Sequence, residues 1–233
     1  MDFDGATLRQ RLDQVRGRIS DAAARSGRAA GAVTLVGVTK TVAAEVVRAA
    51  VALGLGDLGE NRVQEAQAKI AAVGRERARW HLVGHLQRNK AGRAVDLFDR
   101  IHSVDGLELA GALSGRAATS GRLLPVLVEV NVSGEATKFG VAPAELEPLL
   151  ERIAALPGLR LDGLMTVGPP VESAPQARPG FARLRELRDR AERSLGLRLP
   201  ELSMGMSGDF EVAVEEGSTM VRVGTAIFGS RPA

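Results

Sequence analysis

Eight short apolar stretches, each followed by a segment with helical spacing, run along this chain of 233 residues. The strand-like stretches cover 33–38, 57–59, 80–83, 97–102, 123–130, 159–165, 201–204 and 219–223. The helical segments cover 43–53, 62–73, 89–95, 106–119, 143–155, 180–195, 209–215 and 225–228. Alternating strands and helices require a parallel sheet with right-handed crossovers. Eight such pairs in about 200 residues predict an α/β fold, a closed (β/α)8 barrel of the TIM type. An open doubly wound sheet is the alternative, although it rarely needs eight even repeats.

One extra helix precedes the first strand. Its apolar residues are spaced by four, three, four and four positions, which indicates a helix over 7–26 with one buried stripe: Leu8, Leu12, Val15, Ile19 and Ala23. No linker or low-complexity segment interrupts the chain, so we expect a single domain over residues 1–233. The proline-rich loop 168–179 is too short to separate domains, and we consider it as a cap or lid over one face of the barrel.

Composition excludes several classes of function. The chain has no cysteine, and therefore no disulfide framework or thiolate metal site. It has no apolar run long enough to cross a membrane, and its start does not resemble a signal peptide, so we expect a cytoplasmic protein. The net charge of +3 is spread over the sequence, with acids close to the arginines, and aromatic residues are few. Nucleic-acid binding is therefore not expected.

Polar residues at the strand ends are the candidates for function, because barrels carry their reactive groups after the carboxyl ends of the strands. Lys40 ends the first strand, and only four of the 31 basic residues are lysines. A partly desolvated lysine amine is a nucleophile toward aldehydes, which arginine is not. A lysine that merely extends into solvent is the alternative.

The last two units indicate an anion site. Two turns of small residues, Ser207-Gly208 and Gly224-Thr225, can present backbone N–H groups at the corner where barrels often hold a phosphate. In the final strand, alternation places Arg222 on the same face as Met220, which we interpret as the inner face. His81 and His85 lack converging carboxylates, so we expect no metal site.

Five motifs together resemble the pyridoxal phosphate homeostasis proteins, a family related to the N-terminal barrel of alanine racemase (pyridoxal-phosphate fold type III). They are Val38-Thr-Lys-Thr41, Gly59-Glu-Asn-Arg62, His81-Leu-Val-Gly-His-Leu-Gln-Arg-Asn-Lys90, Leu202-Ser-Met-Gly-Met-Ser207 and Gly217-Ser-Thr-Met-Val-Arg-Val-Gly-Thr-Ala-Ile-Phe-Gly229. The likeness runs from about residue 7 to 230, with the motifs in the family's order.

The resemblance implies that pyridoxal 5′-phosphate (PLP) is the cofactor and that Lys40 forms a Schiff base with it. It implies that Ser207, Gly224 and Thr225 hold the phosphate and that Arg222 faces the pyridine nitrogen. Asn61 resembles a residue beside the ring, and His85 and Met204 resemble residues lining the same pocket. Lys138 is similar to a second family lysine that interacts with the cofactor, although we do not assign it the Schiff base.

A carrier that stores or delivers PLP is the predicted function, with no catalytic residues. The resemblance to alanine racemase also allows a small PLP-dependent amino-acid enzyme, but that enzyme pairs its lysine with a tyrosine, and this chain has none. A barrel enzyme that binds a phosphate but never PLP is a third hypothesis. For the carrier we expect a monomer, with PLP-dependent apoenzymes as transient partners.

Overall fold

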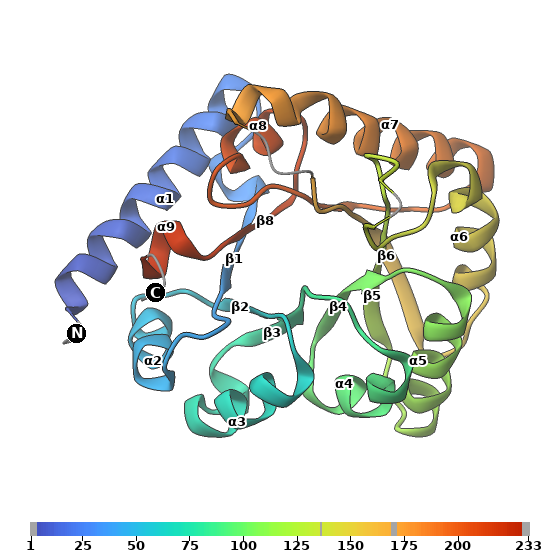
Figure 1. Ribbon diagram of the computed structural model, residues 1–233, viewed down its shortest axis with the longest axis horizontal. Coiled ribbons are helices and arrows are strands. Elements are labelled where there is room, and N and C mark those ends of the chain that lie inside the picture. The colour runs from blue at the N-terminus through green and yellow to red at the C-terminus, as the bar shows by residue number, and fades with distance from the viewer. Residues whose placement is uncertain (1–3, 136, 169–171, 230–233) are drawn as a thin grey trace.

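The computed structural model describes residues 4–135, 137–168 and 172–229. Eight parallel strands follow one another around a closed barrel in sequence order, and β1 pairs with β8 to close it (Figure 1). The strands are β1 Thr34–Val38, β2 Asp57–Glu60, β3 Arg79–Leu82, β4 Arg100–Val104, β5 Leu124–Glu129, β6 Leu159–Met165, β7 Glu201–Ser203 and β8 Met220–Val223. The predicted barrel is therefore confirmed, and the open-sheet alternative is wrong.

Helices surround the strands on the outside of the barrel (Figure 1). They are α1 Gly5–Arg25, α2 Ala44–Ala52, α3 Val63–Val73, α4 Ala91–Leu97, α5 Leu107–Thr119, α6 Leu146–Ala154, α7 Arg178–Leu195, α8 Phe210–Glu215 and α9 Thr225–Phe228. Short 3-10 turns supplement them: η1 Ala30–Ala32, η2 Arg75–Arg77, η3 Arg88–Lys90, η4 Pro143–Glu145 and η5 Ala174–Ala177.

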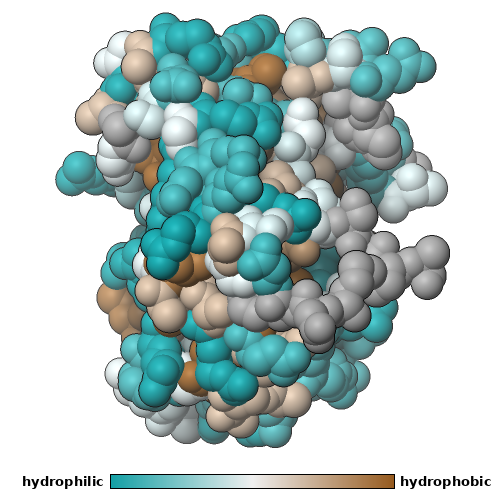
Figure 2. All heavy atoms as spheres, turned by 90° about the vertical axis from the view of Figure 1, so that its left-hand side faces the viewer, coloured by the Kyte–Doolittle hydropathy of each residue, from teal (hydrophilic) through white to brown (hydrophobic). Residues whose placement is uncertain are grey.

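The extra N-terminal helix, α1, lies against α8 and α9 at the closing side of the barrel (Figure 1). Asp4 caps its start by accepting from the backbone N–H groups of Ala6 and Thr7. Its predicted apolar stripe is buried. The face of the molecule that includes α1 is mostly hydrophilic, with scattered apolar residues (Figure 2). No helix in the described part of the chain is long and apolar enough to cross a membrane.

Side-chain alternation along the strands separates an apolar outer layer from a polar interior. In β3, Trp80 and Leu82 belong to the core cluster shared with the helices, whereas His81 between them bonds to Asp57 and His102 inside the barrel. The same alternation turns Arg222 inward, as predicted, while its neighbours in β8 join the outer core. The barrel interior therefore holds a column of polar side chains, and the main apolar core is the layer between strands and helices.

One predicted element differs. The sequence predicted a strand over 97–102, but β4 begins only at Arg100. Leu97 is the last residue of α4, and the Phe98 N–H still donates to Ala94 in the helical pattern. Asp99 then accepts hydrogen bonds from Arg75 and from the Trp80 N–H. Side-chain contacts of Asp99 and continuation of the helix thus override the apolar pattern at 97–98.

The proline-rich loop is described only in part. Residues 169–171 lie outside the described residues, so the expectation that the loop 168–179 caps one face of the barrel stays a prediction. Its second half forms η5, where Ser173 and Gln176 make a reciprocal capping box, and continues into α7.

Candidate functional site

A cavity of about 340 Å³ opens at the carboxyl end of the strands. It brings together six of the eight predicted site residues, which come from β8 and from the segments after β1, β2, β7 and β8: Lys40, Asn61, Ser207, Arg222, Gly224 and Thr225. Val38, Val83, Val167, Met206 and Gly208 complete its lining. An amine, a guanidinium and two small-residue turns thus share one cavity with apolar walls.

Lys40 lies half-buried in the turn that follows β1. The next residue, Thr41, has a backbone φ of 64°, which β-branched residues rarely adopt. Its N–H donates to the Glu65 carboxylate at 2.5 Å, and on the other side of Lys40 the Thr39 carbonyl accepts from Lys69. Helix α3 therefore holds the backbone on both sides of Lys40.

The support of this turn is a buried ion pair that the sequence did not reveal. Lys69 Nζ lies 2.6 Å from Glu60 Oε1, and the Thr39 hydroxyl donates to the same oxygen at 2.5 Å. Glu60 is fully buried; burial raises its pKa, opposed by the hydrogen bonds from Lys69 and Thr39. Because lysine is rare in this chain, the sequence drew attention to Lys40, but it indicated no role for Lys69. The one sequence signal for this ion pair was that Lys69 follows Glu60 by nine residues.

Asn61 enters the cavity because two loops approach closely there. A Cβ placed on Gly84 would lie 2.5 Å from the Asn61 carbonyl oxygen and 2.8 Å from its Cα. Only glycine after β3 therefore lets the segment after β2 keep its position.

We expect Gly84→Ala to reduce the free energy of unfolding by about 1–3 kcal/mol, because the new methyl group meets backbone that must move. Urea unfolding measures the change. Gly92→Ala is the matched control, since nothing lies within 4 Å of its Cβ position. Equal stability of the two variants would contradict the close approach.

Arg222 enters the cavity from inside the barrel, where it is 4% exposed. Its Nη1 donates to Ser203 Oγ at 2.6 Å and its Nη2 to the Thr166 carbonyl at 2.8 Å. Burial lowers its pKa to about 10, opposed by the charges of Glu129 and Asp209, so the guanidinium stays charged at neutral pH. A fixed cation therefore lines the cavity.

The two small-residue turns meet at one oxygen atom. Ser207 Oγ accepts from the backbone N–H groups of Gly224 at 3.2 Å and Ala226 at 3.3 Å. Amide donors of the second turn thus converge on an oxygen acceptor supplied by the first. A phosphate oxygen has the same acceptor chemistry, so this corner fits a phosphate group.

Two predicted residues are absent from the cavity lining. Met204 is fully buried and belongs to the apolar core cluster. His85 is exposed in the loop after β3, where it stacks on Phe139 with ring centroids 3.8 Å apart and lies 3.2 Å from Asp105. Lys138, beside Phe139, pairs with Glu135 at 3.2 Å. The family resemblance implied that Met204 and His85 line the pocket, but neither is part of the lining of this cavity.

Glu129, at the end of β5, is a buried carboxyl group that the sequence did not single out. It is 6% exposed, and burial raises its pKa to about 7, opposed by Arg222 and assisted by Asp105. Among the described residues no group of three histidines or carboxylates could hold a metal ion.

We expect Glu129→Gln to remove a pH-dependent loss of stability. A folded pKa of about 7 against 4.5 for the free group means that the folded state binds the proton more tightly. The contribution of Glu129 to the free energy of unfolding is then highest below pH 4.5. It falls by about 1–3 kcal/mol as the pH rises to about 7 and above. The variant should equal the wild type at pH 4.5 and exceed it at pH 8 in urea unfolding. Glu151→Gln, at an exposed helix position, is the control; the same pH profile in both variants would contradict the shift.

Comparison with known proteins agrees with this barrel. A family model described as the alanine racemase N-terminal domain matches residues 11–232. Alanine racemase from Corynebacterium glutamicum, 20% identical, superposes with a TM-score of 0.76 over all of this chain and 63% of its own, which supports the fold alone. The fold therefore defines a barrel of the alanine racemase N-terminal class.

Closer relatives identify the branch of that class. The pyridoxal phosphate homeostasis protein of Aquifex aeolicus is 46% identical, covering 95% of this chain and 97% of the relative, and that of Escherichia coli K12 is 40% identical over 94% and 95%. PipY of Synechococcus elongatus, solved with PLP bound, is 38% identical with a TM-score of 0.85, covering 95% of this chain and all of its own. The chain belongs to the pyridoxal phosphate homeostasis protein family.

Proposed function

We propose that this chain binds PLP in the barrel-mouth cavity and acts in PLP homeostasis as a reversible carrier. The observation that carries the proposal is that Lys40, Arg222 and the Ser207–Gly224 corner line one cavity. These are an amine for the aldehyde, a cation for the ring and amide donors for the phosphate. The names of the relatives and the PLP-bound PipY structure support the same ligand.

Each group has a defined part in this proposal. The Lys40 amine attacks the aldehyde carbon, a C=N bond replaces the C=O bond, and the oxygen leaves as water. When bound, PLP supplies an electrophilic carbon and an electron-withdrawing ring. Ser207, Gly224 and Thr225 hold the phosphate, Arg222 directs a charged donor to the pyridine nitrogen, and Asn61 lies beside the ring. PLP-dependent apoenzymes receive the cofactor.

A carrier fits the available acid–base groups better than an amino-acid enzyme. Racemisation requires a positioned acid–base pair, and the chain has no tyrosine to partner Lys40. Arg222 keeps its proton at neutral pH and so disfavours protonation of the ring nitrogen, which weakens carbanion stabilisation. Reversible bonding without turnover is the expected result.

Borohydride reduction followed by mass spectrometry tests the proposal. Incubation with PLP should give the long-wavelength absorption of a lysine–PLP adduct, and reduction should fix the cofactor on the peptide that contains Lys40. Pyridoxal, which lacks the phosphate, should label the protein less under the same conditions. Labelling spread over the four lysines would overturn the assignment, and no spectral change would favour a phosphate enzyme that never binds PLP.

Turnover distinguishes a carrier from an enzyme. The PLP-loaded protein should exchange the α-proton of alanine or other amino acids only at a low rate. Sustained racemisation on the order of 1 s⁻¹ or faster would make it an enzyme.

A further inference from the structure

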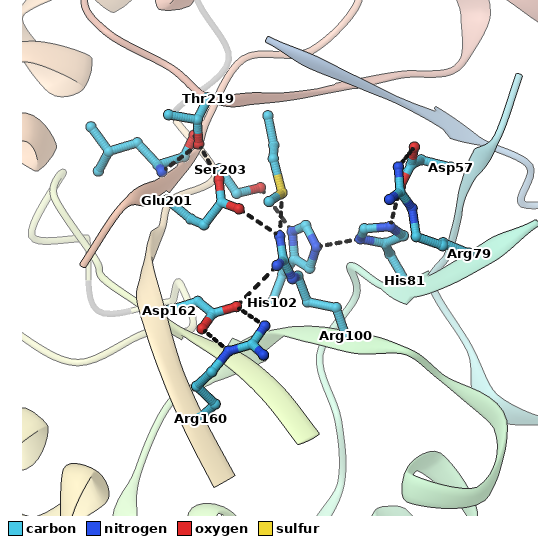
Figure 3. A network of polar contacts seen from close by, with 12 residues as sticks. Asp57, Arg79, His81, Arg100, His102, Arg160, Asp162, Glu201, Ser203 and Thr219 are labelled. Carbon is cyan, nitrogen blue, oxygen red and sulfur yellow. Dashed lines mark hydrogen bonds and ion pairs between the residues drawn. The ribbon is translucent and has the colours of Figure 1, made fainter. Parts of the chain in front are cut away.

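A line of hydrogen bonds runs through the barrel interior from its amino-terminal end to Ser203 (Figure 3). Arg222 then donates to Ser203. At the far end, Arg79 donates twice to the Asp57 carboxylate, at 2.8 and 2.7 Å. His81 Nε2 lies 3.0 Å from Asp57 Oδ1, and His81 Nδ1 lies 2.9 Å from His102 Nε2. His102 Nδ1 lies 2.8 Å from Ser203 Oγ, which accepts from Arg222 at 2.6 Å.

Both ends of this line have fixed polarity. Arg222 can only donate, so Ser203 Oγ accepts there. Asp57 can only accept while it is ionised. Burial would raise its pKa, but hydrogen bonds from His81 and Arg79, together with the charge of Arg79, lower it. His81 therefore donates from Nε2 to Asp57.

The fixed ends determine the protons between them. A neutral His81 that donates from Nε2 must accept at Nδ1, so His102 donates from Nε2. Burial, assisted by the charges of Arg222 and Arg100, lowers the pKa of His102 well below its usual value. A neutral His102 then accepts at Nδ1, so the Ser203 hydroxyl donates its hydrogen bond to that nitrogen.

The opposite proton order leaves a donor without an acceptor. If His81 carried both protons, its Nδ1 would donate to His102 Nε2, and His102 Nδ1 would donate to Ser203 Oγ. The serine oxygen would then accept two hydrogen bonds, one from His102 and one from Arg222. Among the described residues the Ser203 hydroxyl proton would then have no hydrogen-bond acceptor. A charged His81 would also lie near Arg100, a further cation in the barrel interior (Figure 3). The neutral arrangement satisfies every group, and hydrogen bonds that all run one way reinforce one another.

We propose that Asp57, His81, His102 and Ser203 form a directional chain that positions Arg222 for the pyridine ring of PLP. The Ser203 hydroxyl donates its proton to His102 Nδ1, so the lone pairs of the serine oxygen are left to accept from Arg222. Among the described residues, Ser203 and the Thr166 carbonyl accept from two of the five N–H groups of Arg222, which also lines the cavity. The inference rests on the proposed function and adds positioning residues to it.

Nitrogen NMR of the histidine rings tests the direction without cofactor. Uniformly ¹⁵N-labelled protein should show His81 and His102 as single neutral tautomers with the proton on Nε2, and the third histidine, His85, is assigned by a His85→Gln variant. A proton on Nδ1 of His102, or a charged His102 at neutral pH, would overturn the proposal. The result is independent of PLP binding, so a failure of the proposed function is seen separately in the labelling assay.

Serine variants test the consequence for the ligand. Ser203→Ala removes the acceptor for Arg222 and should raise the Kd for PLP about tenfold and shift the absorption of the bound cofactor. Ser114→Ala is the matched control, because its buried hydroxyl donates to the Pro157 carbonyl at 2.6 Å outside the barrel interior. Its Kd should stay within about twofold of wild type, since only stability is affected. Equal effects of the two variants would overturn the positioning role.

A third variant keeps the test valid if Ser203→Ala does not fold. Asp57→Asn, at the far end of the chain, replaces the obligatory acceptor by a group that can donate. We expect His102 to change from a single tautomer to a mixture of tautomers. Arg160→Gln breaks the Arg160–Asp162 pair, which does not belong to the line of hydrogen bonds, and should leave the His102 tautomer unchanged. If the His102 tautomer is unchanged in Asp57→Asn, then Asp57 does not set the direction of the hydrogen bonds as far as His102. That result would overturn the proposal.

Discussion

Lys40→Ala is expected to abolish covalent capture of PLP while leaving the barrel folded. The side chain lies half-buried at the cavity and supplies the primary amine there. After borohydride reduction, incorporated cofactor should fall below about a hundredth of wild type, because alanine offers no nucleophile. The absorption of the lysine adduct should vanish, while inhibition by inorganic phosphate should still reveal weak binding of PLP at the Ser207–Gly224 corner.

Two other lysines are the controls for this experiment. Lys90→Ala changes a lysine of η3 outside the cavity lining and should leave labelling at the wild-type level. Lys138→Ala changes the lysine in the loop beside Phe139 and tests whether a second amine competes. Full labelling of Lys40→Ala, with the label moved to Lys138, would contradict the assignment of the Schiff base to Lys40.

Lys69→Met is expected to destabilise the fold by about 3–5 kcal/mol at pH 7. Methionine fills the volume but leaves Glu60, which is fully buried, without its cation. The Thr39 carbonyl also loses a donor, so the turn that carries Lys40 should loosen. Urea unfolding measures the first effect, and a slower labelling of Lys40 by PLP measures the second.

The pH profile and a double variant identify the cause. Without Lys69, the folded pKa of Glu60 should lie further above its usual 4.5, because burial acts unopposed by that amine. The folded state then binds the proton more tightly, so the loss of stability should shrink as pH falls toward 4.5. Glu60→Gln/Lys69→Met removes both charges and should recover most of the loss. A double variant as unstable as Lys69→Met would point to packing instead of charge.

The fold was predictable because every unit repeats the same local pattern. The spacing of Leu8, Leu12 and Val15 indicated α1 regardless of its partners, and the alternation in 219–223 correctly turned Arg222 inward. Local patterns failed where tertiary contacts decide. At 97–98, continuation of α4 and the contacts of Asp99 moved the start of β4 by three residues.

The cavity was predictable to the extent that strand ends meet at one face of a barrel. This rule places Lys40, Asn61 and Ser207 together although they are far apart in sequence. It does not state which residues of a motif reach the cavity surface, and Met204 and His85, which the family resemblance places in the pocket, are not part of the lining. Two further features depend on distances between different strands and helices: the Glu60–Lys69 pair and the hydrogen bond between His81 and His102. The periodicity of a sequence gives no information about such distances.

The pairing of β1 with β8 has a consequence for the order of events during synthesis. Val36 lies opposite Arg222 in this seam, so the amine and the guanidinium come from the two ends of the chain. A ribosome-bound chain that still lacks β8 holds the lysine but neither the arginine nor the amide corner. If PLP binds as proposed, we expect full affinity only after β8 has joined β1, and we expect the bound ligand to stabilise this pairing by mass action.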